Sequence, residues 1–122
     1  MMFKTVCLLK RRQGMSFEDF IAYYETYHRK IGEKVLPTAR RYMRRYLRPV
    51  PNPLTGEVEE LEYDVLTEIW FETREAYEAG MAALAVPETA AEIAEDEERL
   101  FDRSKNRFCT IEEHESILAA AV

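Results

Sequence analysis

The residues with the clearest potential for chemistry lie between positions 23 and 28. His28 follows Tyr23, Tyr24 and Tyr27, so an imidazole and three phenolic hydroxyls share two turns of a predicted helix. An imidazole is the side chain that exchanges protons most readily near neutral pH. Spacing alone favours a structural or capping histidine at a helix end, and the neighbouring hydroxyls favour the proton-transfer interpretation.

The helix that carries these residues is predicted to run from Ser16 to Ile31. Ser16 can accept a backbone N–H at the helix start, and Asp19 three residues later resembles a capping box. Apolar side chains then recur at spacings of three and four, which places Tyr24 and His28 on the inward face. Gly32 is expected to end the helix in the left-handed conformation.

Four β-prone segments predict strands, at residues 3–10, 38–48, 63–71 and 107–114. Segment 38–48 also repeats its apolar residues at helical spacing, so strand is only the favoured interpretation. As a strand it would place alternate residues on one face: Arg40, Tyr42, Arg44, Tyr46 and Arg48. Its arginines either form a solvated edge or line an anionic pocket.

The second half of the chain predicts two further helical segments. Thr73 can cap the first, and Pro87 suits the first turn of the second. Asp96 lies three residues after Ile93 and four before Leu100, so its carboxylate could reach beneath the helix, although a solvated acidic helix is the default for residues 95–98. The proline-rich and acidic stretch 49–62 predicts an exposed loop, of a length typical of a lid or a mobile excursion.

Composition excludes several classes of function. The chain has 122 residues, 47% of them hydrophobic, and a net charge of -6, which argues against nonspecific nucleic-acid binding. No apolar run approaches the roughly 18 residues needed to span a membrane, and the start of the sequence does not resemble a signal peptide. We therefore expect a cytoplasmic protein without a metal site, in which Cys7 and Cys109 are buried, reduced thiols.

The order strand, helix, strand, strand, helix, strand indicates an α+β fold. It is the order of a ferredoxin-like βαββαβ antiparallel sheet with its helices on one face, built as a single domain over residues 1–122. The 63–71 strand carries apolar residues on both faces. Because a large exposed apolar patch is unfavourable for a monomer, we expect a second subunit to cover the open face.

Several motifs resemble the EthD-domain family within the dimeric α/β barrel superfamily. They are residues 8–20, the Tyr-Tyr-Glu-x-Tyr-His run ending at His28, the Glu-Asp-Glu-Glu-Arg-Leu-Phe-Asp run at 95–102, and 109–114. The resemblance implies a homodimer with a pocket at each sheet, and it maps the motif histidine to His28 and the acid of the late helix to Asp96. The family includes fungal polyketide dehydratases, proteins encoded with ether-degrading monooxygenases, and proteins of unknown role. Its frequent proline shortly after the histidine is absent here.

Two functions follow from these residues. The first is a cofactor-free lyase or isomerase acting on an aromatic or polyketide-like small molecule: His28 moves a proton, Asp96 orients it, and Tyr24 or Tyr46 holds a substrate oxygen. The second is a non-catalytic small-molecule-binding or accessory dimer, in which the same groups satisfy a buried polar cluster. Haem binding and RNA recognition also occur in related folds, but a single candidate histidine and the absence of an RNA-binding signature favour neither.

Overall fold

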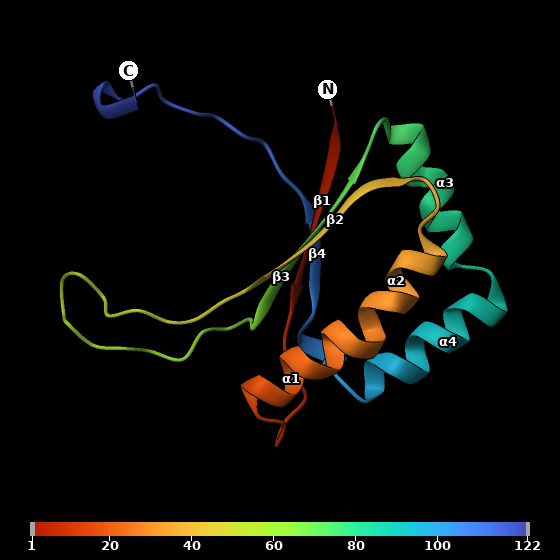
Figure 1. The fold of residues 1–122 in the computed structure, drawn as a ribbon, viewed down its shortest axis with the longest axis horizontal. Coiled ribbons are helices and arrows are strands. Elements are labelled where there is room, and N and C mark those ends of the chain that lie inside the picture. The colour runs from red at the N-terminus through yellow and green to blue at the C-terminus, as the bar shows by residue number, and fades with distance from the viewer. Residues whose placement is uncertain (1, 122) are drawn as a thin grey trace.

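The computed structural model describes residues 2–121, which form one antiparallel sheet with helices on one face (Figure 1). The strands are β1 (Phe3–Leu9), β2 (Ala39–Tyr46), β3 (Val65–Phe71) and β4 (Arg107–Thr110), in the spatial order β2-β3-β1-β4. The helices are α1 (Phe17–Tyr23), α2 (Arg29–Val35), α3 (Arg74–Leu84) and α4 (Pro87–Glu98). This is the predicted ferredoxin-like α+β fold.

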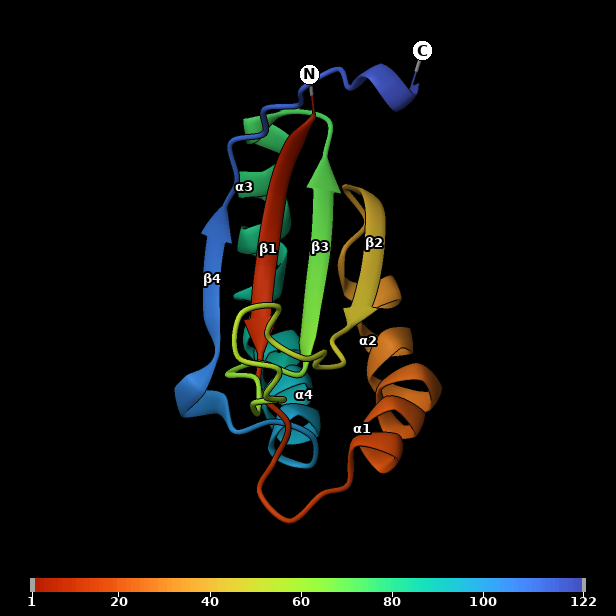
Figure 2. The same ribbon diagram turned by 90° about the vertical axis from the view of Figure 1, so that its left-hand side faces the viewer.

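The register of the strands fixes which residues face the helices. Cys7 pairs with Thr67 and Phe108, and Thr67 pairs with Arg44, so these four residues form one row across the sheet. This row and every second row from it face the helices. The intervening rows, such as Lys4–Trp70–Arg41, lie on the opposite face. Figure 2 looks onto that second face, which the helices leave uncovered. The two faces of the sheet therefore have separate roles.

The first helical stretch begins as predicted but ends later. Ser16 accepts a hydrogen bond from the Asp19 backbone N–H at 3.1 Å. The chain then passes through a π-helical turn, η1 (Tyr24–His28), directly into α2, which continues to Val35. The expectation that Gly32 ends the helix is wrong, because Gly32 lies inside α2 with the Tyr42 ring against it. A Cβ atom at Gly32 would lie 2.7 Å from the Tyr42 hydroxyl oxygen.

The two later helices begin where the sequence predicts. Thr73 accepts a hydrogen bond from the Ala76 backbone N–H at 3.1 Å, and Pro87 occupies the first turn of α4. Their inward faces close the core over the sheet. The central cluster of the core consists of fully or almost fully buried side chains: Leu9, Phe20, Tyr24, Val65, Leu100 and Phe101.

Two expectations about the last strand are wrong. β4 ends at Thr110, because its partner β1 extends only two residues beyond Thr5, the residue opposite Thr110, and the acidic residues that follow favour strands poorly. Cys109 is exposed, while Cys7 is partly buried and lines a cavity described below; both thiols are free in the described chain. Within residues 2–121, no helix is long and apolar enough to cross a membrane.

We predict that Gly32→Ala destabilises the fold by about 1–2 kcal/mol in chemical denaturation. The new methyl group would collide with the Tyr42 ring, and this cost exceeds the gain of about 1 kcal/mol in helix propensity. Gly80→Ala is the matched control in α3, where the nearest contacts would be looser, at 3.0 and 3.1 Å. A Gly32→Ala protein as stable as the wild type would contradict the close packing of Tyr42.

Candidate active site

The centre of the site is a hydrogen bond between η1 and α4, which lie on the same face of the sheet. His28 Nδ1 lies 2.8 Å from Asp96 Oδ2, and Tyr23 donates a hydrogen bond of 2.6 Å to Asp96 Oδ1. Both His28 and Asp96 are buried, with 8% and 5% of their surface exposed. Because a carboxylate only accepts hydrogen bonds, it holds the proton of the imidazole on Nδ1. The structure thus brings together two residues that lie far apart in the sequence.

The π-helical turn affects the directions in which Tyr23, Tyr24 and His28 point. The Arg29 N–H bonds the Tyr24 carbonyl five residues back, so the turn is wider than in an α-helix. Tyr24 and His28 consequently point toward the sheet side, and their rings meet edge to face at a centroid distance of 4.9 Å. Tyr23 points toward α4 instead, where it reaches Asp96.

The His28 ring borders an internal cavity of about 130 Å³ between the sheet and the helices. The ring is held on one edge by Asp96 and packs edge to face against Phe101 at 5.2 Å. Its Nε2 atom makes no hydrogen bond to any residue within 2–121, and every fully buried polar side-chain atom there has a partner. Nε2 therefore remains free for a molecule in the cavity.

Three residues with hydroxyl groups line the same cavity, Tyr42 and Thr67 from the sheet and Tyr24 from η1. The Tyr24 hydroxyl lies 2.8 Å from Thr67 Oγ1, and Tyr42 donates to the Tyr24 hydroxyl at 3.3 Å. Burial raises the pKa of Tyr24 well above its ordinary value and that of Tyr42 to about 12. Both phenols consequently stay protonated at neutral pH and can donate hydrogen bonds to a ligand oxygen.

Glu97 and Cys7 complete the polar lining of the cavity. Burial raises the pKa of the Glu97 carboxyl, while His28 and the ion pair with Arg103, at 3.4 Å, act in the opposite direction. Burial, with a smaller contribution from Glu97, raises the pKa of the Cys7 thiol to about 12, so Cys7 is not an activated nucleophile. The described residues contain no cluster of three or more His, Cys, Asp or Glu side chains suited to a metal ion.

Tyr46 lies outside the cavity lining. Its hydroxyl donates a hydrogen bond to Glu25, which also forms a two-point ion pair with Arg44 at 2.7 and 3.0 Å. Arg44 lowers the pKa of Glu25, so this carboxylate remains charged. The interaction fastens β2 to the π-helical turn, and Arg44 alone among the β2 arginines turns to the helix side, where it serves this contact.

Of the residues proposed from sequence, His28, Asp96 and Tyr24 lie in direct or bridged contact. Tyr46 packs its ring edge to face against Tyr24 at 5.9 Å, but its hydroxyl is directed to Glu25 and it does not line the cavity. Tyr42 and Thr67 were not singled out as site residues. The alternation of side chains in 38–48 places Tyr42 on the same face as Tyr46, and Thr67 is the polar member of the apolar row Val65–Thr67–Ile69. The sequence therefore contained a signal for Tyr42 and for Thr67 as site residues. The π-helical turn left no sequence signal that we can identify.

A family model decides the classification. The EthD domain model matches residues 12–104, which includes η1, α4 and both members of the His28–Asp96 pair. The chain belongs to the EthD domain family. A search of curated proteins found no match.

Solved structures of similar fold include other EthD proteins. An EthD family protein from Bacillus halodurans is 18% identical, with a TM-score of 0.64, over 93% of this chain and 100% of that one. An EthD-like protein from Ralstonia eutropha is 17% identical, with a TM-score of 0.57, over 90% and 86%. A dimeric protein of unknown function and ferredoxin-like fold from Bacteroides fragilis is 15% identical, with a TM-score of 0.55, over 92% and 96%. At these identities the likeness establishes the fold of this EthD domain.

We predict that Asp96→Ala changes the neutral tautomer of His28. With the carboxylate present, the proton sits on Nδ1; without it, the imidazole shifts toward the Nε2–H form, which ¹⁵N NMR of the ring distinguishes. The fold should lose about 1–3 kcal/mol of stability, because Nδ1 is left buried without a partner.

Tyr23→Phe is the control for this tautomer shift. It removes only the hydrogen bond to Asp96 Oδ1 and should leave the Nδ1–H tautomer in place. An unchanged tautomer in Asp96→Ala would contradict the role of the carboxylate.

Proposed function

We propose that this EthD-domain protein is a cofactor-free proton-transfer enzyme, of the lyase or isomerase kind, acting on an aromatic or polyketide-like carbonyl compound. One observation carries the proposal: His28 is held at Nδ1 by Asp96 while its ring borders a cavity that also contains the Tyr24 and Tyr42 hydroxyls. A positioned base facing hydrogen-bond donors across a small cavity suits the formation of an enolate.

The chemistry assigned to the site is a proton transfer next to a carbonyl group. His28 Nε2 removes a proton from the carbon beside the carbonyl, and Asp96 stabilises the resulting imidazolium. When the substrate binds, the Tyr42 hydroxyl turns its proton from Tyr24 to the carbonyl oxygen and donates a hydrogen bond to it as negative charge develops. The imidazolium then returns the proton, either to another carbon in an isomerisation or to a departing hydroxyl group, which leaves as water in a dehydration.

The dimensions of the site limit the part of the substrate that reacts. The inner cavity of about 130 Å³ is close to the roughly 150 Å³ apolar cavity that accommodates benzene, so it fits one ring. A wider hollow of about 380 Å³ shares Cys7, Ile69, Leu84 and Phe108 with it. We therefore assign the reacting ring to the inner cavity and any further substituent to the outer hollow.

A non-catalytic binding protein is the second candidate. The observation that favours it is that the Tyr42, Tyr24 and Thr67 hydroxyls already bond one another, as in a satisfied buried polar cluster. This candidate requires ligand binding without any proton exchange, so an exchange assay separates the two functions.

The proposal extends to assembly and location. We propose that the chain forms a homodimer through the open face of the sheet, supported by the partly buried Trp70, Leu66 and Met43 on that face and by the dimeric Bacteroides protein of similar fold. We also propose a cytoplasmic location, which suits the free thiols of Cys7 and Cys109.

The proton-transfer role predicts that the wild-type protein accelerates exchange of the α-hydrogens of cyclohexanone in D₂O, followed by NMR. His28→Ala should reduce the protein-dependent rate by about 100-fold or more, because it removes the base. His114→Ala is the matched control, since it removes the other histidine, which is exposed in the C-terminal tail. Exchange by wild-type protein no faster than in buffer, or an equal rate in His28→Ala, would overturn the catalytic proposal.

The assignment of the oxygen-binding residue predicts different effects for two tyrosines. Tyr42→Phe should weaken the binding of cyclohexanone by about 1 kcal/mol in calorimetric titration, because a cavity donor is lost. Tyr46→Phe should leave the affinity unchanged, since its hydroxyl serves Glu25. The reverse pattern would return the oxygen-binding role to Tyr46.

A further inference from the structure

Two segments project from the sheet on the side away from the helices. We name residues 47–63, between β2 and β3, the β2–β3 arm, and residues 111–118, after β4, the C-terminal arm. In Figure 1 both run outward from opposite ends of the sheet, leaving a space between them in front of the open face. Figure 2 shows the same two segments emerging at opposite ends of that face. Neither segment is part of the site around His28.

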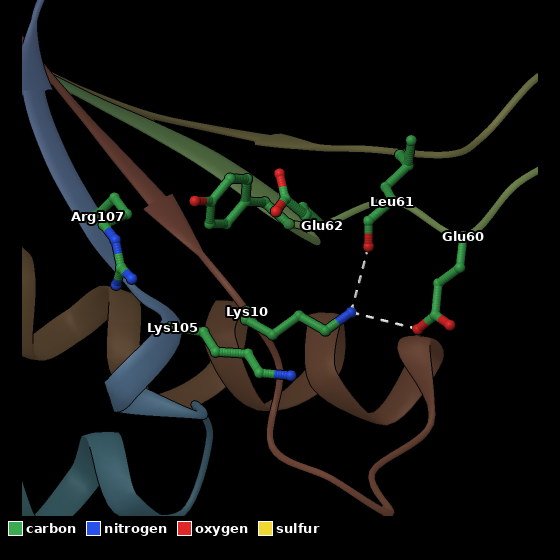
Figure 3. Close-up of a pocket in the computed structure, with 7 residues that line it drawn as sticks. Lys10, Glu60, Leu61, Glu62, Lys105 and Arg107 are labelled. Atoms are coloured by element: carbon green, nitrogen blue, oxygen red, sulfur yellow. Dashed lines mark hydrogen bonds and ion pairs between the residues drawn. The ribbon is translucent and has the colours of Figure 1, made fainter.

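The β2–β3 arm has a defined conformation. At its tip, the Asn52 side chain accepts from the Leu54 N–H at 2.8 Å, the Asn52 N–H donates to the Glu57 carbonyl at 2.8 Å, and Gly56 has a φ of 76°. At its root, Lys10 Nζ contacts Glu60 Oε1 and the Leu61 carbonyl, each at 3.3 Å (Figure 3). Hydrogen bonds within the tip therefore shape the turn, and the contacts of Lys10 hold the root against the sheet.

Apolar side chains on both arms are left in solvent. The most exposed are Leu54, at 93%, Ile117, at 87%, and Val50, at 76%. Such residues on an ordered, projecting arm find few apolar partners within the same chain. They indicate a surface of another molecule that the arms contact.

The charges of the arms and of the open face are complementary. Residues 47–63 contain four glutamates and one arginine, Arg48, and residues 111–118 contain three glutamates and no lysine or arginine. By register, the open face carries the basic side chains Lys4, Arg41, Arg45 and Arg107, with the buried Glu68 as its only acid in the strands. Within the chain Lys4 pairs with Glu113 at 2.6 Å and Arg45 pairs with Glu68, which leaves Arg41 and Arg107 to meet the acidic arms of a second copy. A surface with acidic arms and a basic face fits a second copy of itself, because a two-fold axis brings each arm to the other copy's face.

We propose that the β2–β3 arm and the C-terminal arm clasp a second copy of this chain, with their glutamates against the basic open face of that copy and their apolar side chains buried beside it. The clasp deepens the proposed homodimer and is independent of the proposed chemistry at His28. It gives the long proline-rich segment a role that the site does not supply.

A charge exchange tests the clasp. The arm variant Glu57→Lys/Glu59→Lys and the face variant Arg41→Glu/Arg107→Glu change side chains that are exposed in the single chain. By light scattering at micromolar concentration, the wild type should have twice the chain mass of 14.4 kDa, and each variant alone should be monomeric. An equimolar mixture should regain the dimeric mass, because the basic arm then meets the acidic face and the acidic arm meets the basic face.

Two further variants make the result decisive. Glu78→Lys/Glu98→Lys, the matched control, makes the same charge change on exposed helix positions and should remain dimeric. Leu54→Ser/Val58→Ser, at exposed arm positions that the fold does not need, should raise the dimer dissociation constant by at least about tenfold.

The outcomes separate the clasp from the dimer. A monomeric wild type overturns both the homodimer and the clasp. If the Glu57→Lys/Glu59→Lys and Leu54→Ser/Val58→Ser variants form dimers as tight as those of the wild type, the clasp is wrong and the homodimer still stands. None of these results depends on the exchange assay at His28.

Discussion

The hydrogen bond between His28 and Asp96 is the constraint on which the site depends. It joins η1 to α4 at 2.8 Å, so these two helical segments must dock in one register for it to form. Tyr24 and Phe101 pack edge to face against the His28 ring, and Phe20 packs against both of them. A buried carboxylate without a partner is costly, which couples correct packing of the core to correct placement of the imidazole.

The sheet contributes the other half of the site. Its helix-side rows place Tyr42 and Thr67 against Tyr24, and the Glu25–Arg44 ion pair holds β2 to the turn that carries His28. Gly32 admits the Tyr42 ring because it has no side chain. The same alternation of side chains gives the sheet a second face with different chemistry, rich in arginine and apolar residues. One strand pattern therefore serves a cavity on one side and, in the dimer that we propose, an association surface on the other.

Local patterns predicted most of the fold, because caps, alternation and helical spacing are encoded within a few residues. Ser16, Thr73 and Pro87 mark helix starts that the structure reproduces. Spacing predicted the inward position of His28, and it allowed an inward position for Asp96 while a solvated acidic helix remained the default. Their contact depends on how α4 docks, which spacing does not encode. The interior position of Gly32 was missed because it depends on a tertiary contact with Tyr42. The π-helical turn was missed because no local pattern of residues indicated it. The alternation of side chains along β2 places Tyr42 and Tyr46 on the same face, so the sequence does not distinguish their roles, and only packing does.

The central claim is that the cavity beside His28 holds a ring-sized ligand against the imidazole and the Tyr42 hydroxyl. Intermolecular NOEs between phenol and isotope-labelled protein test it most directly, because they locate the ligand without requiring turnover. The account predicts NOEs from the phenol ring to the side chains of His28, Tyr42 and Ile93, all of which line the cavity. NOEs confined to the open face of the sheet, or saturating phenol without any contact to His28, would contradict it.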